Sequence, residues 1–214
     1  MTAQNNLSLL ESLPQDLLGE ILSRVASSSR EDIGNCLLVS KTISSAVEDE
    51  RVFNKLNLRP QTMNPQTTFV QYNSLMDKCI RSDNPAAHYI EGVKQYFVYD
   101  NTVLGMYHLR KSAEGSYGNG TYLYAILLLC TGNQEEGTMV LRSLGWEASR
   151  RRGDRCWREN KISLRTFIIT VKPEYIQNMM TNAPPLTCHW NDLDTRCARC
   201  YIFKQMQKFI IFIQ

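Results

Sequence analysis

An internal repeat between residues 87 and 144 limits most strongly what this chain can fold into. The stretch AHYIEG is followed by GMYHLRKSAEG, and the later stretch GTYLYA is followed in the same way by GTMVLRSL. Like residues recur at a spacing of 32 or 33 positions: Tyr89 with Tyr122, Gly105 with Gly137, and Leu109 with Leu141. This period is typical of helix-turn-helix repeats, in which small residues let paired helices approach closely. The sequence therefore predicts stacked helix pairs over residues 69–144.

The first part of the chain predicts a separate unit of three helices over residues 10–58. Its opening helix begins near Pro14, ends at a run of serines, and carries leucine, isoleucine and valine three or four positions apart on one face. A second apolar stretch, Ile33–Val47, follows two acidic residues that suit a helix N-terminus, and we expect it to form two short helices with a turn near Ser40. A unit of fewer than 50 residues is too small to cover all of its own apolar surface.

Prolines mark the other boundaries. Residues 59–68 contain two prolines among polar residues, so we expect a linker between an N-terminal unit (8–58) and a helical repeat region (69–150). The remainder, 151–214, is expected to be an extension with an irregular tail. Within it, residues 152–171 suit a helix and a strand about equally well, and both alternatives stay open. The overall prediction is a mainly α fold.

Composition and charge exclude several classes of protein. The 214 residues are 43% hydrophobic and carry a net charge of +3, which is too small an excess for a nucleic-acid binder. One locally basic run, Ser149–Arg158, is interpreted as solvated surface, with nuclear import or phosphate binding as alternatives. The longest apolar run, Ala125–Cys130, is far below the roughly 20 residues that span a bilayer. We expect an intracellular protein, cytoplasmic and/or nuclear, with no membrane partner.

No catalytic constellation is visible in the sequence. The three histidines, His88, His108 and His189, are scattered and do not have the spacing of a metal hydrolase. Neither a nucleophile elbow nor a phosphate-binding Gly-Lys-Ser/Thr loop is present. Cys156 has basic neighbours but no paired histidine, so we interpret it as a structural residue. The prediction is a protein without enzymatic activity.

The cysteines near the C-terminus are the most informative polar feature. Seven cysteines without the regular spacing of a secreted disulfide scaffold indicate reduced thiols. Cys197 and Cys200 have the Cys-x-x-Cys spacing of half a zinc knuckle, and Cys188 lies nine positions before Cys197. Because Cys188 and His189 are adjacent, we expect only one of them to face a metal, and Cys156 to supply the fourth ligand. A structural zinc and ordinary thiols are the two alternatives, and no other cofactor is expected.

The N-terminal unit resembles the F-box, the short three-helix module that docks the adaptor of cullin-type ubiquitin ligases. Its first helix is matched by Leu-Pro at 13–14, Leu-Leu at 17–18, Ile-Leu at 21–22 and Val25. Its Val-x-Lys stretch is matched by Val39 and Lys41, and its closing apolar end by the segment 51–53. Ile43 and Phe53 stand where the family usually has a larger aromatic residue. The whole chain is similar to plant proteins in which an F-box precedes tetratricopeptide-type repeats and a cysteine-containing end.

The resemblance implies a function and a partner. It implies the non-catalytic substrate-recognition subunit of an SCF ubiquitin ligase, whose F-box binds a Skp-type adaptor. The repeat region 69–150, with or without the tail, is then expected to hold an unknown substrate protein. The adaptor-binding residues that it implies are Leu13, Pro14, Leu17, Leu18, Ile21, Leu22, Val39 and Lys41. Two other interpretations stay open: a helical-repeat scaffold without a ligase function, and a small zinc-dependent protein that uses Cys188, Cys197 and Cys200.

Overall fold

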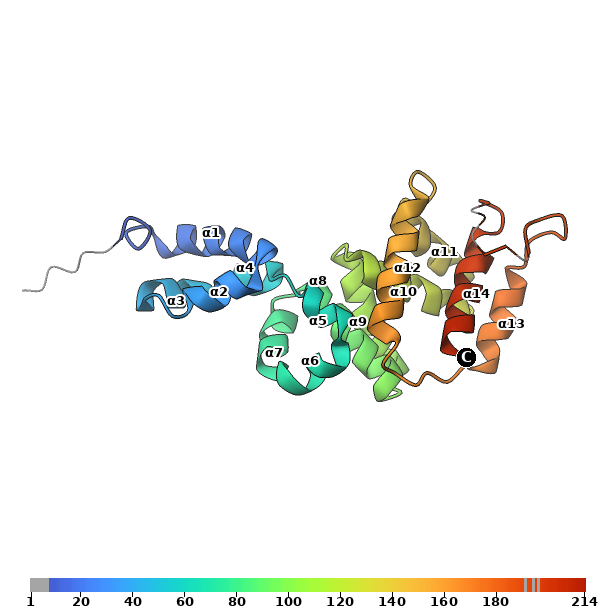
Figure 1. The fold of residues 1–214 in the computed structure, drawn as a ribbon, viewed down its shortest axis with the longest axis horizontal. Coiled ribbons are helices and arrows are strands. Elements are labelled where there is room, and N and C mark those ends of the chain that lie inside the picture. Colours follow the sequence, from blue (N-terminus) through green and yellow to red (C-terminus); the bar gives the residue numbers. More distant parts are fainter. Residues whose placement is uncertain (1–7, 191, 194, 196) are drawn as a thin grey trace, which may run out of the picture.

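The fold consists of helices throughout the part of the chain that can be described. The computed structural model describes residues 8–190, 192–193, 195 and 197–214, and within them it contains fourteen α-helices, one π-type turn and no β-strand. Figure 1 shows an elongated molecule, with the N-terminal helices at one end and the C-terminal helices at the other. The mainly α prediction is confirmed. None of the helices among these residues has the length and apolarity that crossing a membrane requires.

The N-terminal unit contains four helices, because the second apolar stretch divides into two short helices at a turn before Ser40, as expected. They are α1 (Gln15–Ser28), α2 (Arg30–Cys36), α3 (Lys41–Val47) and α4 (Glu50–Lys55). The last three begin at side-chain caps: Ser29, Ser40 and Asp49 accept hydrogen bonds from the first-turn amides of α2, α3 and α4. These caps compensate for helices too short to be stable by themselves.

One face of α1 forms the core of this unit. Leu18 and Leu22 are buried against α3 and α4, where Ile43 and Phe53 are also buried. The two positions at which the chain departs from the usual aromatic residues therefore still fill the core.

The beginning of α1 is held to α4 by an ion-pair bridge. The Arg51 guanidinium lies 2.8 Å from an Asp16 carboxylate oxygen and 2.7 Å from one of Asp49. The hydrogen bond from Arg51 lowers the pKa of Asp49. A Cβ at Gly19 would collide with the Asp49 carboxylate, so glycine is what lets α4 approach α1 here.

The segment expected to be a linker is helical instead. It forms α5 (Arg59–Met63) and α6 (Pro65–Gln71), each with a proline in its first turn, where the missing N–H costs little. The buried Asn84 side chain then ties the two regions together: its amide donates to the carbonyls of Phe53 and Leu56, while its carbonyl caps α8. The N-terminal unit is thus packed onto the repeats.

The repeat region follows the predicted period. Its helices are α7 (Asn73–Arg81), α8 (Pro85–Val93), which continues as the π-type turn η1 (Lys94–Val98), α9 (Thr102–Glu114), α10 (Gly118–Cys130) and α11 (Gln134–Ser143). Helix α9 packs on α8 and η1, and α11 packs on α10. Gly105 and Gly137 lie at equivalent crossings: a Cβ on either would lie 2.6 Å from Tyr96 Cβ or 2.8 Å from Leu129 Cγ.

The C-terminal extension is more regular than expected. Residues 152–164 lie in α12 (Arg150–Leu164), which resolves the helix-or-strand alternative in favour of a helix, and residues 168–172 have no regular structure. The expected irregular tail contains α13 (Pro173–Thr181) and α14 (Tyr201–Ile213). Phe209, Ile210 and Ile213 of α14 are buried, so the last apolar segment completes the core.

Two histidines that are 20 positions apart in the sequence meet between α8 and α9. The Nδ1 atoms of His88 and His108 lie 2.9 Å apart, and His88 Nε2 lies 3.2 Å from an Asp83 carboxylate oxygen. Because the carboxylate only accepts, neutral His88 carries its proton on Nε2, and its Nδ1 accepts from His108 Nδ1–H. Burial lowers the pKa of both imidazoles, and for His108 the neighbouring His88 adds to this effect.

We expect this pair to make the fold sensitive to acid. Well above pH 6.5, the ordinary histidine pKa, both imidazoles are neutral in the folded and in the unfolded chain. As the pH falls below that value, the two imidazoles become protonated in the unfolded chain but stay neutral in the folded chain, where their pKa is lower. The free energy of unfolding therefore decreases. The melting temperature should therefore drop between pH 7.5 and pH 5.5, and drop less in His88→Gln. Equal pH slopes for the two proteins would contradict this assignment.

Candidate functional sites: an apolar surface, a basic cleft and a cysteine cluster

The N-terminal unit, which forms one end of the molecule (Figure 1), carries an exposed group of apolar side chains. On α1, Leu17 and Ile21 are 49% and 38% exposed, although they lie on a helix whose opposite face is core. The turn between α2 and α3 adds Leu38, which is 86% exposed. We call the group the N-terminal apolar surface, and its members are Leu9, Leu10, Pro14, Leu17, Ile21, Leu37, Leu38 and Val39.

The part of this surface on α1 and the part on the turn between α2 and α3 are held side by side. The Gln15 side chain donates to the Thr42 carbonyl over 3.4 Å, which joins the start of α1 to the start of α3. The Ser40 hydroxyl lowers the pKa of the Glu11 carboxyl, and the hydrogen bonds from Ser8 do so as well. Single exposed leucines are ordinary, but a gathering of this size marks an interaction surface.

The predicted adaptor-binding residues divide into two groups. Pro14, Leu17, Ile21, Val39 and Lys41 are exposed, and Leu13 is half-buried. Leu18 and Leu22 are instead 0% and 3% exposed, so they support α1 from inside the unit and are not available to a partner as it stands.

Four members of the N-terminal apolar surface were not among the predicted adaptor-binding residues: Leu9, Leu10, Leu37 and Leu38, although Leu38 lies in the stretch 38–41 that resembles the F-box. They lie in turns, outside any helical period, so periodicity gave no signal for them.

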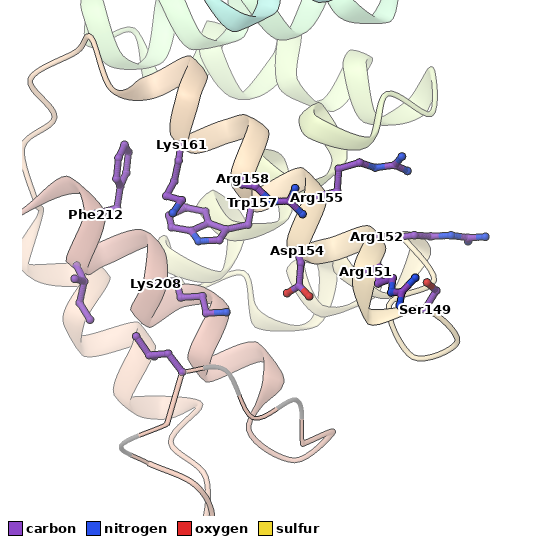
Figure 2. Close-up of a pocket in the computed structure, with 12 residues that line it drawn as sticks. Ser149, Arg151, Arg152, Asp154, Arg155, Trp157, Arg158, Lys161, Lys208 and Phe212 are labelled. Atoms are coloured by element: carbon purple, nitrogen blue, oxygen red, sulfur yellow. The ribbon is translucent and has the colours of Figure 1, made fainter.

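A large cleft lies between α12 and α14 (Figure 2) and has a volume of about 1170 Å³. In Figure 2, Asp154 and Trp157 project from α12 toward α14, which carries Lys208 and Phe212. The rings of Trp157 and Phe212 meet edge to face at 5.7 Å, and the Lys161 ammonium lies 5.5 Å above the Trp157 ring. The lining therefore combines an apolar floor with basic side chains.

Positive charge is concentrated at this cleft. Six basic side chains line it, Arg151, Arg152, Arg155, Arg158, Lys161 and Lys208, against a single acidic one, Asp154. The cleft thus carries a formal +5, whereas the whole chain carries +3, so the rest of the chain is net acidic. Among the residues that the structure describes, no carboxylate forms an ion pair with Arg151, Arg155 or Arg158. Unpaired cations of this kind attract an anionic partner.

Except for Ser149, the residues that line the cleft belong to the C-terminal extension and not to the repeats. Substrate binding was expected from the repeats, with or without the tail, and the cleft itself was not predicted because α12 and α14 are far apart in the sequence. Among the aromatic residues of the repeats, which were expected to be mostly core, Tyr89 and Tyr122 are buried whereas Tyr99 and Tyr107 are more than half exposed.

Three cysteines and a histidine gather before α14. The Sγ atoms of Cys188 and Cys197 lie 3.8 Å apart, and Cys188 Sγ lies 3.9 Å from His189 Nδ1. Together with Cys200 Sγ, these ligand atoms lie within 4.8 Å of one another. The expectation that Cys188 and His189 cannot face one point is wrong, because the loop between α13 and α14 turns both toward the Cys-x-x-Cys turn.

Cys156 does not belong to this cluster. It is buried on α12, where its Sγ would lie 3.2 Å from a Cβ on Gly118. Burial raises the pKa of its thiol to about 11, which leaves it unreactive at neutral pH. In the cluster His189, and not Cys156, lies beside the three thiols, and the structural interpretation of Cys156 agrees with its burial.

Comparison with known proteins gives matches over most of the chain. Residues 10–55 match the profile of the F-box domain, and residues 59–165 match the profile described as plant tetratrico peptide repeats. The chain is 39% identical over 140 residues to the F-box protein At2g35280 of Arabidopsis thaliana, an alignment that covers 65% of this chain and 85% of that protein. It is 32% identical over 141 residues to the putative F-box protein At1g67623 of the same plant, covering 63% and 46% respectively. No solved structure matches significantly.

Proposed function

This chain belongs to the plant F-box proteins that carry tetratricopeptide-type repeats, and from that premise we propose that it is the substrate-recognition subunit of an SCF ubiquitin ligase. F-box domains in general bind a Skp-type adaptor, and F-box proteins in general recruit targets without carrying out catalysis themselves. The observation that carries the proposal is the N-terminal apolar surface, which this small unit leaves uncovered. Docking of helical apolar faces into grooves is a common way of covering such surface.

The proposed mechanism is positioning. The adaptor covers Leu17, Ile21 and their neighbours, while the repeats and C-terminal helices hold the target at a fixed distance through the packed α4–α8 junction. Transfer of ubiquitin is carried out by other subunits, and the target lysines react because their local concentration is raised. Such a receptor acts in the cytoplasm and/or the nucleus, a placement that the seven free thiols support.

The basic cleft is the proposed site for the target. Its excess of positive charge favours an acidic segment of the target protein, and its floor of Trp157, Ile211 and Phe212 favours apolar residues interspersed with the acids. Arginine and tryptophan are the residue types that most often dominate binding energy at interfaces. A scaffold without a ligase function would account for this cleft equally well but leaves the N-terminal apolar surface without a partner.

Charge reversal in the basic cleft should weaken binding of the target without affecting binding of the adaptor at the N-terminal apolar surface. In Arg151→Glu/Arg158→Glu we expect the affinity for an Asp/Glu-rich peptide to fall at least about tenfold, and the loss to shrink at high salt. Fluorescence anisotropy with a labelled peptide measures this, with Arg81→Glu/Arg165→Glu as the control of equal charge change. In plant extracts, the cleft variant should still capture the adaptor and cullin. Equal peptide affinity in all three proteins would contradict the cleft assignment, and failure of the intact chain to capture adaptor or cullin would contradict the ligase assignment.

A further inference from the structure

The arrangement of Cys188, His189, Cys197 and Cys200 has the dimensions of a closed metal site. Zinc binds thiolates at about 2.3 Å in a tetrahedron, so two thiolates on one ion lie about 3.8 Å apart. The distance between the Sγ atoms of Cys188 and Cys197 is 3.8 Å. A disulfide would instead need about 2.05 Å between the two sulfur atoms. The sulfurs are thus spaced for a shared ion and not for a covalent bond.

The turn between Cys197 and Cys200 directs main-chain donors at a ligand sulfur. The backbone N–H groups of Arg199 and Cys200 both point to the Cys197 sulfur. Main-chain donors aimed at a ligand sulfur stabilise its thiolate form and fix its direction, as outer-shell groups do in metal sites. The Cys200 amide additionally donates to the Cys197 carbonyl over 3.2 Å, which closes the turn.

A buried lysine beside the cluster calls for a negative charge. Lys204 is 2% exposed, its Nζ donates to the Thr195 carbonyl over 2.8 Å, and its ammonium lies against the Cys200 thiol. Among the residues that the structure describes, no carboxylate pairs with it. A buried ammonium without a counter-charge is costly. Three thiolates, one neutral imidazole and Zn²⁺ together carry −1, which matches the charge of Lys204.

The cluster also lies where a bound metal ion would join the two ends of the loop before α14. The chain between α13 and α14, residues 183–199, has no helical residue among those that the structure describes. Its described contacts with α14 are few, one being the Trp190 ring 5.2 Å from that of Phe203. An ion bound by residues at both ends of this loop would fix the start of α14, which carries one wall of the basic cleft.

We propose that Cys188, His189, Cys197 and Cys200 form a structural zinc site that fastens the loop before α14. All four coordination positions are filled by side chains, so the ion has no open position and the site has no hydrolytic role. Binding of zinc displaces the thiol protons to solvent and requires no oxidant or reductant.

The test is the metal content of the full chain, purified without a metal-affinity tag and under reducing conditions. We expect about one zinc per chain by elemental mass spectrometry, and less than about a tenth of that in Cys188→Ser and in Cys197→Ser. Cys36→Ser, which changes a half-buried thiol of the N-terminal unit, should keep its zinc. Cobalt(II) added to the stripped chain should give the visible absorption of a tetrahedral thiolate site, and this signal should weaken in His189→Ala.

Three outcomes would overturn the zinc assignment. One is a chain that purifies in folded form without zinc and does not take up zinc or cobalt. Another is a disulfide between Cys188 and Cys197, found by peptide mapping under non-reducing conditions. The third is zinc content equal in Cys188→Ser, Cys197→Ser and the unaltered chain. Because both serine variants change partly exposed loop residues, loss of zinc can be measured on proteins whose circular dichroism remains helical.

Discussion

Replacing Leu17 by glutamate should abolish adaptor binding while leaving the protein folded. A leucine buried at a partner surface contributes about 2 kcal/mol, and a carboxylate in its place adds a desolvation penalty. A total of about 3 kcal/mol corresponds to a loss of affinity of about 100-fold or more. Leu17 is half exposed in the free chain, so its replacement removes little of the core. Isothermal titration with a purified Skp-type adaptor measures the effect.

The matched control for Leu17→Glu is Val103→Glu. Val103 lies on α9, is 81% exposed, and belongs neither to the N-terminal apolar surface nor to the basic cleft. The Val103→Glu variant places the same charge on a helix, and it should bind the adaptor with the affinity of the unaltered chain. If both variants bind with unchanged affinity while melting normally, α1 is not the adaptor-binding helix.

Gly105→Ala should destabilise the repeat region, although it adds only one methyl group. The new Cβ would lie 2.6 Å from Tyr96 Cβ and 2.8 Å from the Tyr96 backbone nitrogen, so two backbones must move apart. Overpacking of this kind costs about 1–3 kcal/mol. In a chain of this size, 2 kcal/mol lowers the melting temperature by about 4–8 °C. Thermal unfolding followed by circular dichroism measures it.

Gly34→Ala provides the control for the glycine at the helix crossing. Gly34 lies in α2, and a Cβ there would meet no atom within 4 Å. Alanine has the higher helix propensity by about 1 kcal/mol, so this variant should melt at the same temperature or slightly higher. A Gly105→Ala protein that melts no lower than Gly34→Ala would show that the α9 crossing is not tightly packed.

Much of the fold was predictable because its signals are local. The repeat was predicted from the spacing of Tyr89 and Tyr122 and of Gly105 and Gly137, and both glycines lie at helix crossings. The spacing of Leu18 and Leu22 likewise gave the buried face of α1. The helix α14 was not predicted, since an irregular tail was expected there, although its buried residues recur with helical spacing from Tyr201 onward.

The sites were less predictable because they depend on long-range contacts. The basic cleft needs α12 beside α14, and the pairing of His88 with His108 needs α8 beside α9. The Cys-x-x-Cys turn was visible in the sequence, but the direction of His189 depends on the path of the loop before α14. The helical nature of residues 59–71 was hidden because a proline is also compatible with a helix start.

Direct titration of the purified Skp-type adaptor into the unaltered full chain tests the central claim. The N-terminal apolar surface predicts a 1:1 complex with a Kd of about 1 μM or below and a negative heat-capacity change, because apolar surface is buried on binding. Heats indistinguishable from dilution at adaptor concentrations of tens of micromolar, about ten times that Kd or more, would contradict it.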